Sequence, residues 1–377
     1  MIDIIITTDY EIFGNGTGDV RNCLINPTEE LLSICEEHGA KLTLFFEIAE
    51  CWAFEQAEPR GLEQVLGYSP SKLMREQAIE AVHRGHDVQL HVHPQWVGAE
   101  YRSHGWNLNM NYWRLPEMPH GLGDPEDLLS IRGVLSQGKL DFEAMFQPYV
   151  PDYECIVLRA GGSCIQPSGN VVQAMMDVGL MADSSVYKGG YLKEWPFEVD
   201  FREAHSDSVP WRIDPEDINK AIEDHKGEAI WELPIFTRCQ RLSGFSRLKR
   251  LLTAMVGKSK DRPTGCKGKT VFQTHRRKYS MLSPRKLMRF LMEPIAIQWD
   301  YCELSGDEMW EFFEHFLTNR EHREGYYPLI MSGHPKYFAN GVEFRSFLQR
   351  LTASSLFAEG QVGFSTMQRA VRILQSS

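Results

Sequence analysis

The sequence lacks long hydrophobic runs and paired cysteines. No stretch approaches the roughly 18 consecutive apolar residues that a membrane-spanning helix needs, and the first residues form no basic secretion leader. The 8 cysteines are scattered over 377 residues without a C-x-x-C pair or a repeated spacing. This pattern is typical of reduced thiols with no structural disulfide. We therefore expect no membrane span, no disulfide and, by default, a cytoplasmic protein.

Positive charge is also scarce over most of the chain. The 40 Lys and Arg residues against 51 Asp and Glu residues give a formal net charge of -11, which argues against a general nucleic-acid binder. The exception is the basic segment, residues 238–289, with 16 Lys and Arg and one acidic residue, Asp261, hence a net charge of +15. This segment fits a solvated helix and loop, a cationic helix on an anionic membrane, or a grip for the phosphates of a nucleotide- or lipid-linked sugar.

What the chain does contain is enough apolar material for a core. Hydrophobic residues make up 42% and charged residues 24%, which is typical of a globular protein and which we treat as one domain over residues 1–377. Short β-branched runs alternate with helical segments, the pattern of an α/β protein with a parallel sheet or barrel. Seven runs stand out, at residues 3–9, 41–47, 87–93, 155–161, 181–187, 229–236 and 326–334. Helices are expected to start at Pro27 and Pro70 and to stop at Gly39, Gly85 and Gly179.

Ionisable side chains stand near the carboxyl end of each run. They are Asp9, Glu47, His91, His93, Arg159, Asp183, Glu232 and His334. In a closed parallel barrel these ends meet on one face, where catalytic groups gather. Charged residues also collect at any junction of strand and loop, but that explanation becomes weaker when all seven runs share the feature.

The pair His91 and His93 is the strongest candidate for metal binding. Side chains two residues apart on a strand project from the same face, and neutral imidazole is a common ligand of zinc and similar ions. A carboxylate from Asp9-Tyr10-Glu11 could complete the ligand set, with the other left as a base. Ordinary capping of a turn is the alternative for these two acids.

An aromatic insertion follows the paired histidines, over about residues 96–125. It contains Trp96, Tyr101, Trp106 and Trp113 together with several asparagines. Flat aromatic faces and amides suit the binding of sugar rings, whereas an inert lid over a barrel mouth would have the same composition.

Five short motifs occur in order along these runs: Thr7-Thr8-Asp9-Tyr10-Glu11, His91-Val92-His93-Pro94-Gln95-Trp96, Leu158-Arg159-Ala160-Gly161-Gly162, Asp183-Ser184-Ser185-Val186 and Ser332-Gly333-His334-Pro335-Lys336. Together they resemble the motifs of polysaccharide deacetylases, the NodB-homology enzymes of carbohydrate esterase family 4. The resemblance implies a distorted (β/α)7 barrel, with the aromatic insertion and the basic segment over its catalytic face.

The resemblance also implies a role for each motif residue. Asp9 is the general base, Arg159 orients it, His334 protonates the leaving group and Asp183 tunes that histidine. The metal is a divalent ion, by preference Zn2+. Its ligands are Glu11, His91 and His93, with Gln95 as the alternative to His93. Trp96 and Trp113 contact the substrate. Met331 contacts the acetyl group, because Ser332 stands where the family often has leucine.

The implied activity is metal-dependent removal of N-acetyl or related acyl groups from a carbohydrate. The substrate would be a glycan or its phosphate- or lipid-linked precursor. Peripheral contact with a membrane stays one of the three roles considered above for the basic segment. Two alternatives remain open. One is an amidohydrolase or deformylase that acts on a small or lipid-linked nitrogen compound. The other is a catalytically inactive carbohydrate-binding barrel, suggested by the departures at Tyr10 and Gln95.

Overall fold

The computed structural model describes residues 1–103, 105–222, 229–240, 262–271, 294–319, 325–339 and 341–376. Most of the basic segment, including the helix expected within it, lies outside these ranges. Among the described residues, no helix has the length and apolar character to cross a membrane.

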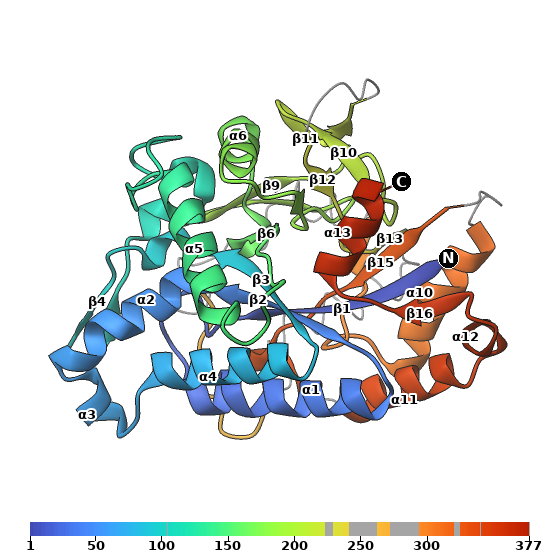
Figure 1. Ribbon diagram of the computed structural model, residues 1–377, viewed down its shortest axis with the longest axis horizontal. Helices are drawn as coiled ribbons and strands as arrows, with labels where there is room; N and C mark the ends of the chain where they lie inside the picture. The colour runs from blue at the N-terminus through green and yellow to red at the C-terminus, as the bar shows by residue number, and fades with distance from the viewer. Residues whose placement is uncertain are drawn as a thin grey trace, which may run out of the picture.

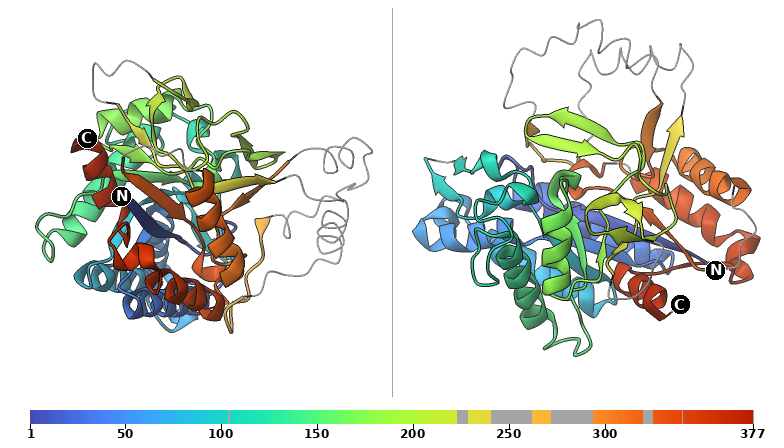
Figure 2. Two further views of the ribbon diagram at one scale, coloured as in Figure 1. Left: turned by 90° about the vertical axis from the view of Figure 1, so that its right-hand side faces the viewer. Right: turned by 90° about the horizontal axis from the view of Figure 1, so that it is seen from above.

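Seven parallel strands form the centre of the protein: β1 (Ile2–Tyr10), β2 (Leu42–Glu47), β3 (Asp87–Val92), β6 (Val157–Ala160), β7 (Ala182–Asp183), β12 (Trp231–Glu232) and β15 (Tyr327–Met331). Their order in the sheet is β12-β7-β6-β3-β2-β1-β15. The sheet curls so strongly that Ile235, just after β12, forms a parallel bridge with Ile330 of β15. The α/β class with a barrel-like parallel sheet is thereby confirmed, and each predicted run contains one strand (Figures 1 and 2).

Two of these strands, β7 and β12, are much shorter than the apolar runs that predict them. At the ends of these strands, side-chain carboxylates accept hydrogen bonds from backbone N–H groups. The N–H of Ser185 donates to Asp183 Oδ2 at 2.8 Å, and the N–H of Val186 donates to Glu232 Oε1 at 3.1 Å. Short polar side chains compete with the strand ladder in this way, so the regular pairing stops early.

Helices follow the strands and cover the outside of the curled sheet (Figure 1). They are α1 (Asn26–Glu37), α2 (Ile48–Ala57), α3 (Leu62–Leu66), α4 (Pro70–His83), α5 (Ile131–Phe146), α6 (Gly169–Asp177), α10 (Gly306–Asn319), α11 (Gly341–Thr352) and α12 (Ser355–Ala358). The last helix, α13 (Met367–Ser376), packs instead against Ile5 on the inner side of the sheet. The predicted starts and stops are confirmed. Ser69 caps α4 by accepting from the N–H of Lys72, and the three stop glycines have φ between 68° and 78°.

Four short antiparallel strand pairs are added to the barrel among the described residues. The alternation of strand and helix in the sequence did not predict them. They are β4 (Glu100–Arg102) with β5 (Gly105–Asn107), β8 (Tyr191–Glu194) with β9 (Phe197–Asp200), β10 (Trp211–Asp214) with β11 (Asp217–Ala221), and β13 (Thr237–Gln240) with β14 (Ile295–Gln298). A last short strand, β16 (Val362–Phe364), pairs with β1.

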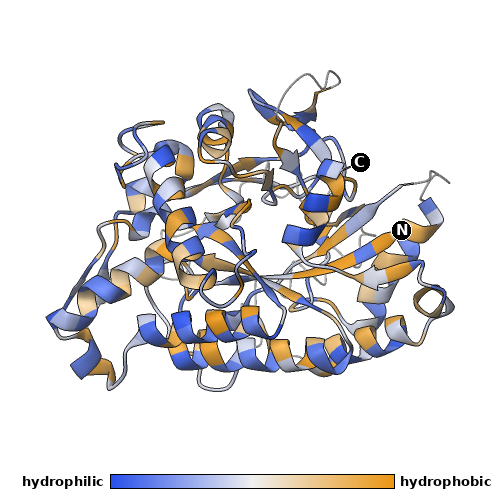
Figure 3. Ribbon diagram, in the orientation of Figure 1, coloured by the Kyte–Doolittle hydropathy of each residue, from blue (hydrophilic) through white to orange (hydrophobic). Residues whose placement is uncertain are grey.

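The interior of the sheet changes from apolar to polar along its axis. Ile5 and its register partner Ile330 pack with Met367 and Val371 of α13 in one buried cluster, and Phe45, the register partner of Asp9, borders this cluster on the carboxyl side. Figure 3 shows the corresponding apolar colour along β1 and β15 and polar residues on the outer faces of the helices. Because alternate strand residues point inward, Thr7 and Asp9 continue the line of Ile5 toward the carboxyl ends. The polar groups therefore gather at that end.

Candidate metal centre at the carboxyl ends of the strands

Four buried side chains meet at the carboxyl ends of β1, β2 and β3: Glu11, Glu47, His91 and His93. One ligand atom from each lies within 4.8 Å of the others. Glu47 and His91 are direct neighbours in the register of β2 and β3. The structure thus brings together the three residues that the sequence assigns to a metal, and it adds Glu47.

The atoms that face one another in this cluster have unused bonding capacity. Glu11 Oε2, Glu47 Oε2, His91 Nε2 and His93 Nε2 are buried and have no hydrogen-bond partner among the described residues. His93 Nε2 lies 2.9 Å from Glu11 Oε2, but without the alignment of a hydrogen bond. A buried polar atom without a partner costs about 1–3 kcal/mol. A cation between the four atoms would satisfy all of them, and two nitrogens with two carboxylate oxygens suit Zn2+ or a similar ion.

The ring of His91 is prepared for this role. Its Nδ1 lies 2.7 Å from the carbonyl oxygen of Arg159, which can only accept, so the proton sits on Nδ1 and the lone pair of Nε2 is free. Burial lowers the pKa of His91 to about 4, and the ring is therefore neutral near pH 7.

His93 has an amide behind it instead of a carbonyl. Gln95 Nε2 lies 3.1 Å from His93 Nδ1 and 3.1 Å from the carbonyl oxygen of Gly14, while Gln95 Oε1 is buried and has no partner. Because an amide nitrogen can only donate, His93 Nδ1 accepts from it and the ring proton sits on Nε2, next to Glu11 Oε2. Binding of a metal through His93 Nε2 would release that proton. Gln95 therefore contacts the nitrogen of His93 that faces away from the four-atom cluster, which favours His93 over Gln95 as the ligand.

The electrostatics of the site call for a further positive charge. Burial, followed by the negative charges of Glu50 and Glu11, raises the pKa of Glu47 well above its usual value. Burial also acts to raise the pKa of Glu11, but Lys336 and the two histidines outweigh it and hold that pKa well below normal. Burial, followed by the negative charge of Glu11, raises the pKa of Glu50 as well. A divalent ion beside Glu11 and Glu47 would oppose this shift and favour the ionised carboxylates.

Asp9 lies beside the metal cluster and is held by Arg159. Burial acts to raise the pKa of Asp9, but Arg159, His91 and His334 together lower it, so the carboxylate is ionised. Arg159 Nη1 donates to Asp9 Oδ1 at 2.7 Å and to Thr7 Oγ1 at 2.9 Å. The guanidinium is itself fixed, since it is 1% exposed and lies 4.0 Å above the ring of Phe45.

His334 occupies the open side of Asp9. Its Nε2 lies 3.4 Å from Asp9 Oδ2 and 3.9 Å from Glu11 Oε1, and its side chain is 31% exposed. The predicted acid partner, Asp183, instead accepts hydrogen bonds from the N–H and the hydroxyl of Ser185 and lies next to Glu232 in the sheet register, and burial raises its pKa. The acids at ion-pair distance from His334 are therefore Asp9 and Glu11, while a role of Asp183 in tuning this histidine stays a prediction.

The predicted substrate-binding side chains lie in the core. Trp96 is 1% exposed, Trp113 2% and Met331 0%. Trp113 packs edge-on against His93, with ring centroids 5.1 Å apart, and Trp96 packs against Phe54. None of the three presents a face to solvent in this structure. The buried ring of Trp113 instead packs against His93, a candidate metal ligand.

Two functional candidates, Glu47 and Lys336, were missed or left unassigned by sequence reasoning. Glu47 ends a predicted strand, and that place is the sequence signal that could have identified it, whereas the register of β2 and β3 sets it beside His91. Lys336 follows His334 by two residues, just as Glu11 follows Asp9. That equal spacing on neighbouring parallel strands is the only sequence signal for a contact between them.

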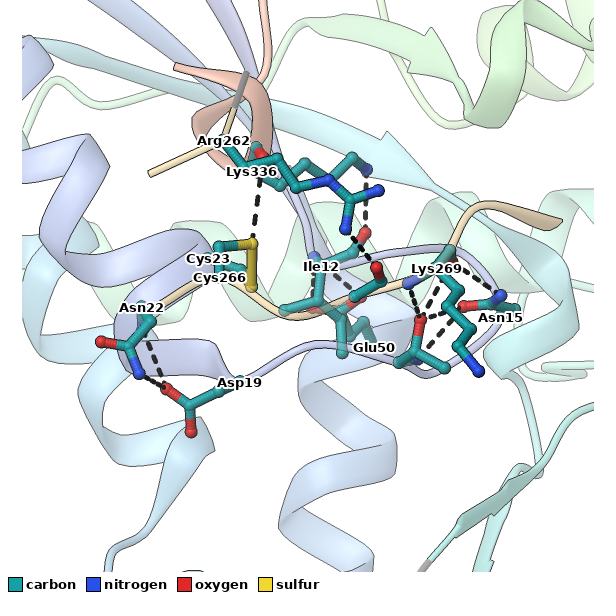
Figure 4. Close-up of a disulfide and its surroundings, with 12 residues drawn as sticks. Ile12, Asn15, Asp19, Asn22, Cys23, Glu50, Arg262, Cys266, Lys269 and Lys336 are labelled. Atoms are coloured by element: carbon teal, nitrogen blue, oxygen red, sulfur yellow. Dashed lines mark hydrogen bonds between the residues drawn. A yellow bond between two sulfur atoms is a disulfide. The ribbon is translucent and has the colours of Figure 1, made fainter. Parts of the chain in front are cut away.

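A disulfide joins Cys23 to Cys266 beside this site, so the prediction of eight reduced thiols is wrong for these two residues. The cysteines lie 243 residues apart, and only folding brings them together. Figure 4 shows the bond next to Lys336, with Lys269 against Asn15. Lys269 O accepts from Asn15 Nδ2 at 2.8 Å, so residues 262–271, here called the strap, lie on the loop after β1.

Reduction of this disulfide is expected to lower the free energy of unfolding by about 2–5 kcal/mol, because the cross-link closes a long loop and restricts the unfolded chain. Urea denaturation with and without dithiothreitol measures the change. The double variant Cys23→Ser/Cys266→Ser serves as the control, since its midpoint should not respond to the reductant. Equal midpoints for the oxidised and reduced wild type would contradict a stabilising bond.

Fold and site together define an α/β protein with a barrel-like sheet and a candidate metal centre at the carboxyl ends of its strands. No family model and no curated protein matches the chain. Among solved structures, a protein described as a polysaccharide deacetylase from Mycobacterium smegmatis aligns with 100% of this chain and 90% of its own, at 12% identity and a TM-score of 0.45.

Two further solved structures align over similar lengths. The allantoinase Puue covers 100% of this chain and 91% of its own at 10% identity and a TM-score of 0.45. A GH57 branching enzyme from Thermococcus kodakaraensis covers 98% of this chain and 70% of its own at 12% identity and a TM-score of 0.43. At this level of similarity the chemistry has to be derived from the residues themselves.

Proposed function

We propose that this protein is a metal-dependent hydrolase that removes acetyl groups from the amide nitrogen of a sugar. The observation that carries the proposal is the set of four buried ligand atoms without hydrogen-bond partners, next to an ionised aspartate and a half-buried histidine. The order of the motifs that resemble polysaccharide deacetylases adds the carbohydrate substrate. A glycan or its phosphate- or lipid-linked precursor is proposed, the latter because of the charge of +15 on residues 238–289.

Glu11, Glu47, His91 and His93 would hold the divalent ion, by preference Zn2+. When bound, such an ion polarises an amide carbonyl and lowers the pKa of water toward neutrality. Glu47 contributes only Oε2, because its Oε1 accepts from the N–H groups of Ala49 and Glu50 and caps α2.

Asp9 and His334 would divide the two proton transfers. The lowered pKa of Asp9 keeps it ready to accept a proton from water, and the Arg159 contact leaves Oδ2 as the accepting atom. His334 lies on the solvent side of Asp9 and can donate a proton to the departing nitrogen. The products are acetate and a free amine.

Acetate release from N-acetylated sugars, measured before and after removal of metal by a chelator, tests the proposal. We expect release that stops with chelation and returns when Zn2+ is added. Stoichiometric metal without release from any acetylated sugar, but with release from small ureides or formamides, would favour the amidohydrolase alternative. Absence of both metal and release would favour an inactive binding barrel.

A further inference from the structure

Lys336 reaches the candidate metal centre from the same turn as His334. The neighbouring parallel strands β1 and β15 each continue into a loop with two polar residues spaced by two. His334 Nε2 lies 3.4 Å from Asp9 Oδ2, and Lys336 Nζ lies 2.5 Å from Glu11 Oε1. The turn Pro335–Tyr337 follows His334 and contains Lys336, and it leaves His334 half-buried at the mouth while Lys336 is buried in the interior.

The ammonium group of Lys336 is enclosed on all described sides. The residue is 5% exposed, and Nζ also donates to the carbonyl oxygen of Ile12 at 2.9 Å. The rings of Phe13 and Tyr337 lie 5.6 and 5.9 Å from it, and the strap packs on Phe13 through Gly268. A buried charge costs free energy unless it is paired and hydrogen-bonded. The surrounding packing therefore keeps the Lys336 ammonium group in contact with Glu11.

The two oxygens of Glu11 are consequently different. Oε1 accepts from Lys336 Nζ, whereas Oε2 faces the two histidines, 2.9 Å from His93 Nε2 and 3.8 Å from His91 Nε2. We propose that Lys336 is a positioning residue that makes Glu11 a ligand through one oxygen only. The inference rests on the proposed metal centre. It implies that Lys336 prevents the carboxylate from binding through both oxygens and so leaves room on the ion for one further ligand.

The variant Lys336→Met tests this role, with Lys139→Met as its matched control. Lys139 on α5 makes the same two kinds of contact away from the site, to Glu143 Oε1 at 2.7 Å and to the carbonyl oxygen of Cys155 at 2.8 Å. Both variants are loaded with Co2+, whose visible absorption weakens as the number of ligands increases. We expect weaker absorption for Lys336→Met and an unchanged spectrum for Lys139→Met.

Binding and turnover give independent readouts. We expect the dissociation constant for Zn2+ to stay at or below the wild-type value, because a positive charge next to the ion is removed. For acetate release we expect kcat to fall by about 10- to 100-fold, in the range of outer-shell partners of a metal, with KM little changed. A mere loss of structure would weaken metal binding instead.

The outcomes are separable from those of the proposed function. If the wild-type protein binds no metal, the proposed function fails. If Lys336→Met binds Co2+ with the wild-type spectrum, the positioning role fails while the metal centre stands. Should Lys336→Met not fold, Lys336→Gln decides: it keeps a donor for Oε1, so a wild-type spectrum is expected and a weakened one overturns the inference.

Discussion

Asp9→Asn is expected to lower kcat/KM for acetate release by about 10²- to 10⁴-fold, the usual contribution of a general base, while the metal content stays at the wild-type level. Asparagine keeps an oxygen that accepts from Arg159 Nη1, now 2.7 Å from Asp9 Oδ1, so the buried guanidinium retains its partner. The amide cannot take up a proton. Acetate release and metal analysis on the same preparation measure the two effects.

Asp141→Asn is the matched control for this substitution. Asp141 also accepts from an arginine, Arg75 Nη2 at 2.9 Å, but it lies on α5 outside the site. We expect its activity to be close to wild type. If Asp9→Asn retained activity within a few-fold of wild type, Asp9 would not be the base. If it lost the metal as well, Asp9 would be a ligand.

His91→Ala should abolish stoichiometric metal binding. The substitution removes one of four converging atoms, together with the Nδ1 contact to the Arg159 carbonyl that aims the ring. Metal analysis after dialysis is the direct measurement. Thermal unfolding gives a second one, because a ligand at 100 times its Kd stabilises the folded state by about 2.7 kcal/mol. Zn2+ should therefore raise the Tm of the wild type but not that of the variant.

His86→Ala separates loss of the ligand from loss of a buried histidine. His86 is also buried, and its Nδ1 accepts from the N–H of Leu42 at 3.0 Å, but it precedes β3 at the opposite end from His91. We expect it to bind metal like the wild type even if it unfolds more easily. Wild-type metal stoichiometry in His91→Ala would overturn the ligand assignment.

Local patterns in the sequence were sufficient to predict much of the fold. Short apolar, β-branched runs predicted all seven barrel strands, and proline and serine signals predicted the starts of α1 and α4. These features depend on backbone preferences within a few residues, which the sequence displays directly. The short hairpins have too few residues for a periodic pattern, and they were missed for that reason.

The grouping of polar residues at the strand ends was likewise predictable from the sequence. Alternation on a strand places His91 and His93 on one face, and a parallel sheet brings the carboxyl ends of its strands to one edge. Which of those residues touch was decided by the tertiary structure alone. Glu11 and Lys336 are 325 residues apart, and Cys23 and Cys266 are 243 apart. Such contacts depend on the register and closure of the sheet and on the packing of its loops. Local sequence determined which groups the site contains, while long-range packing determined their partners, their burial and therefore their charge.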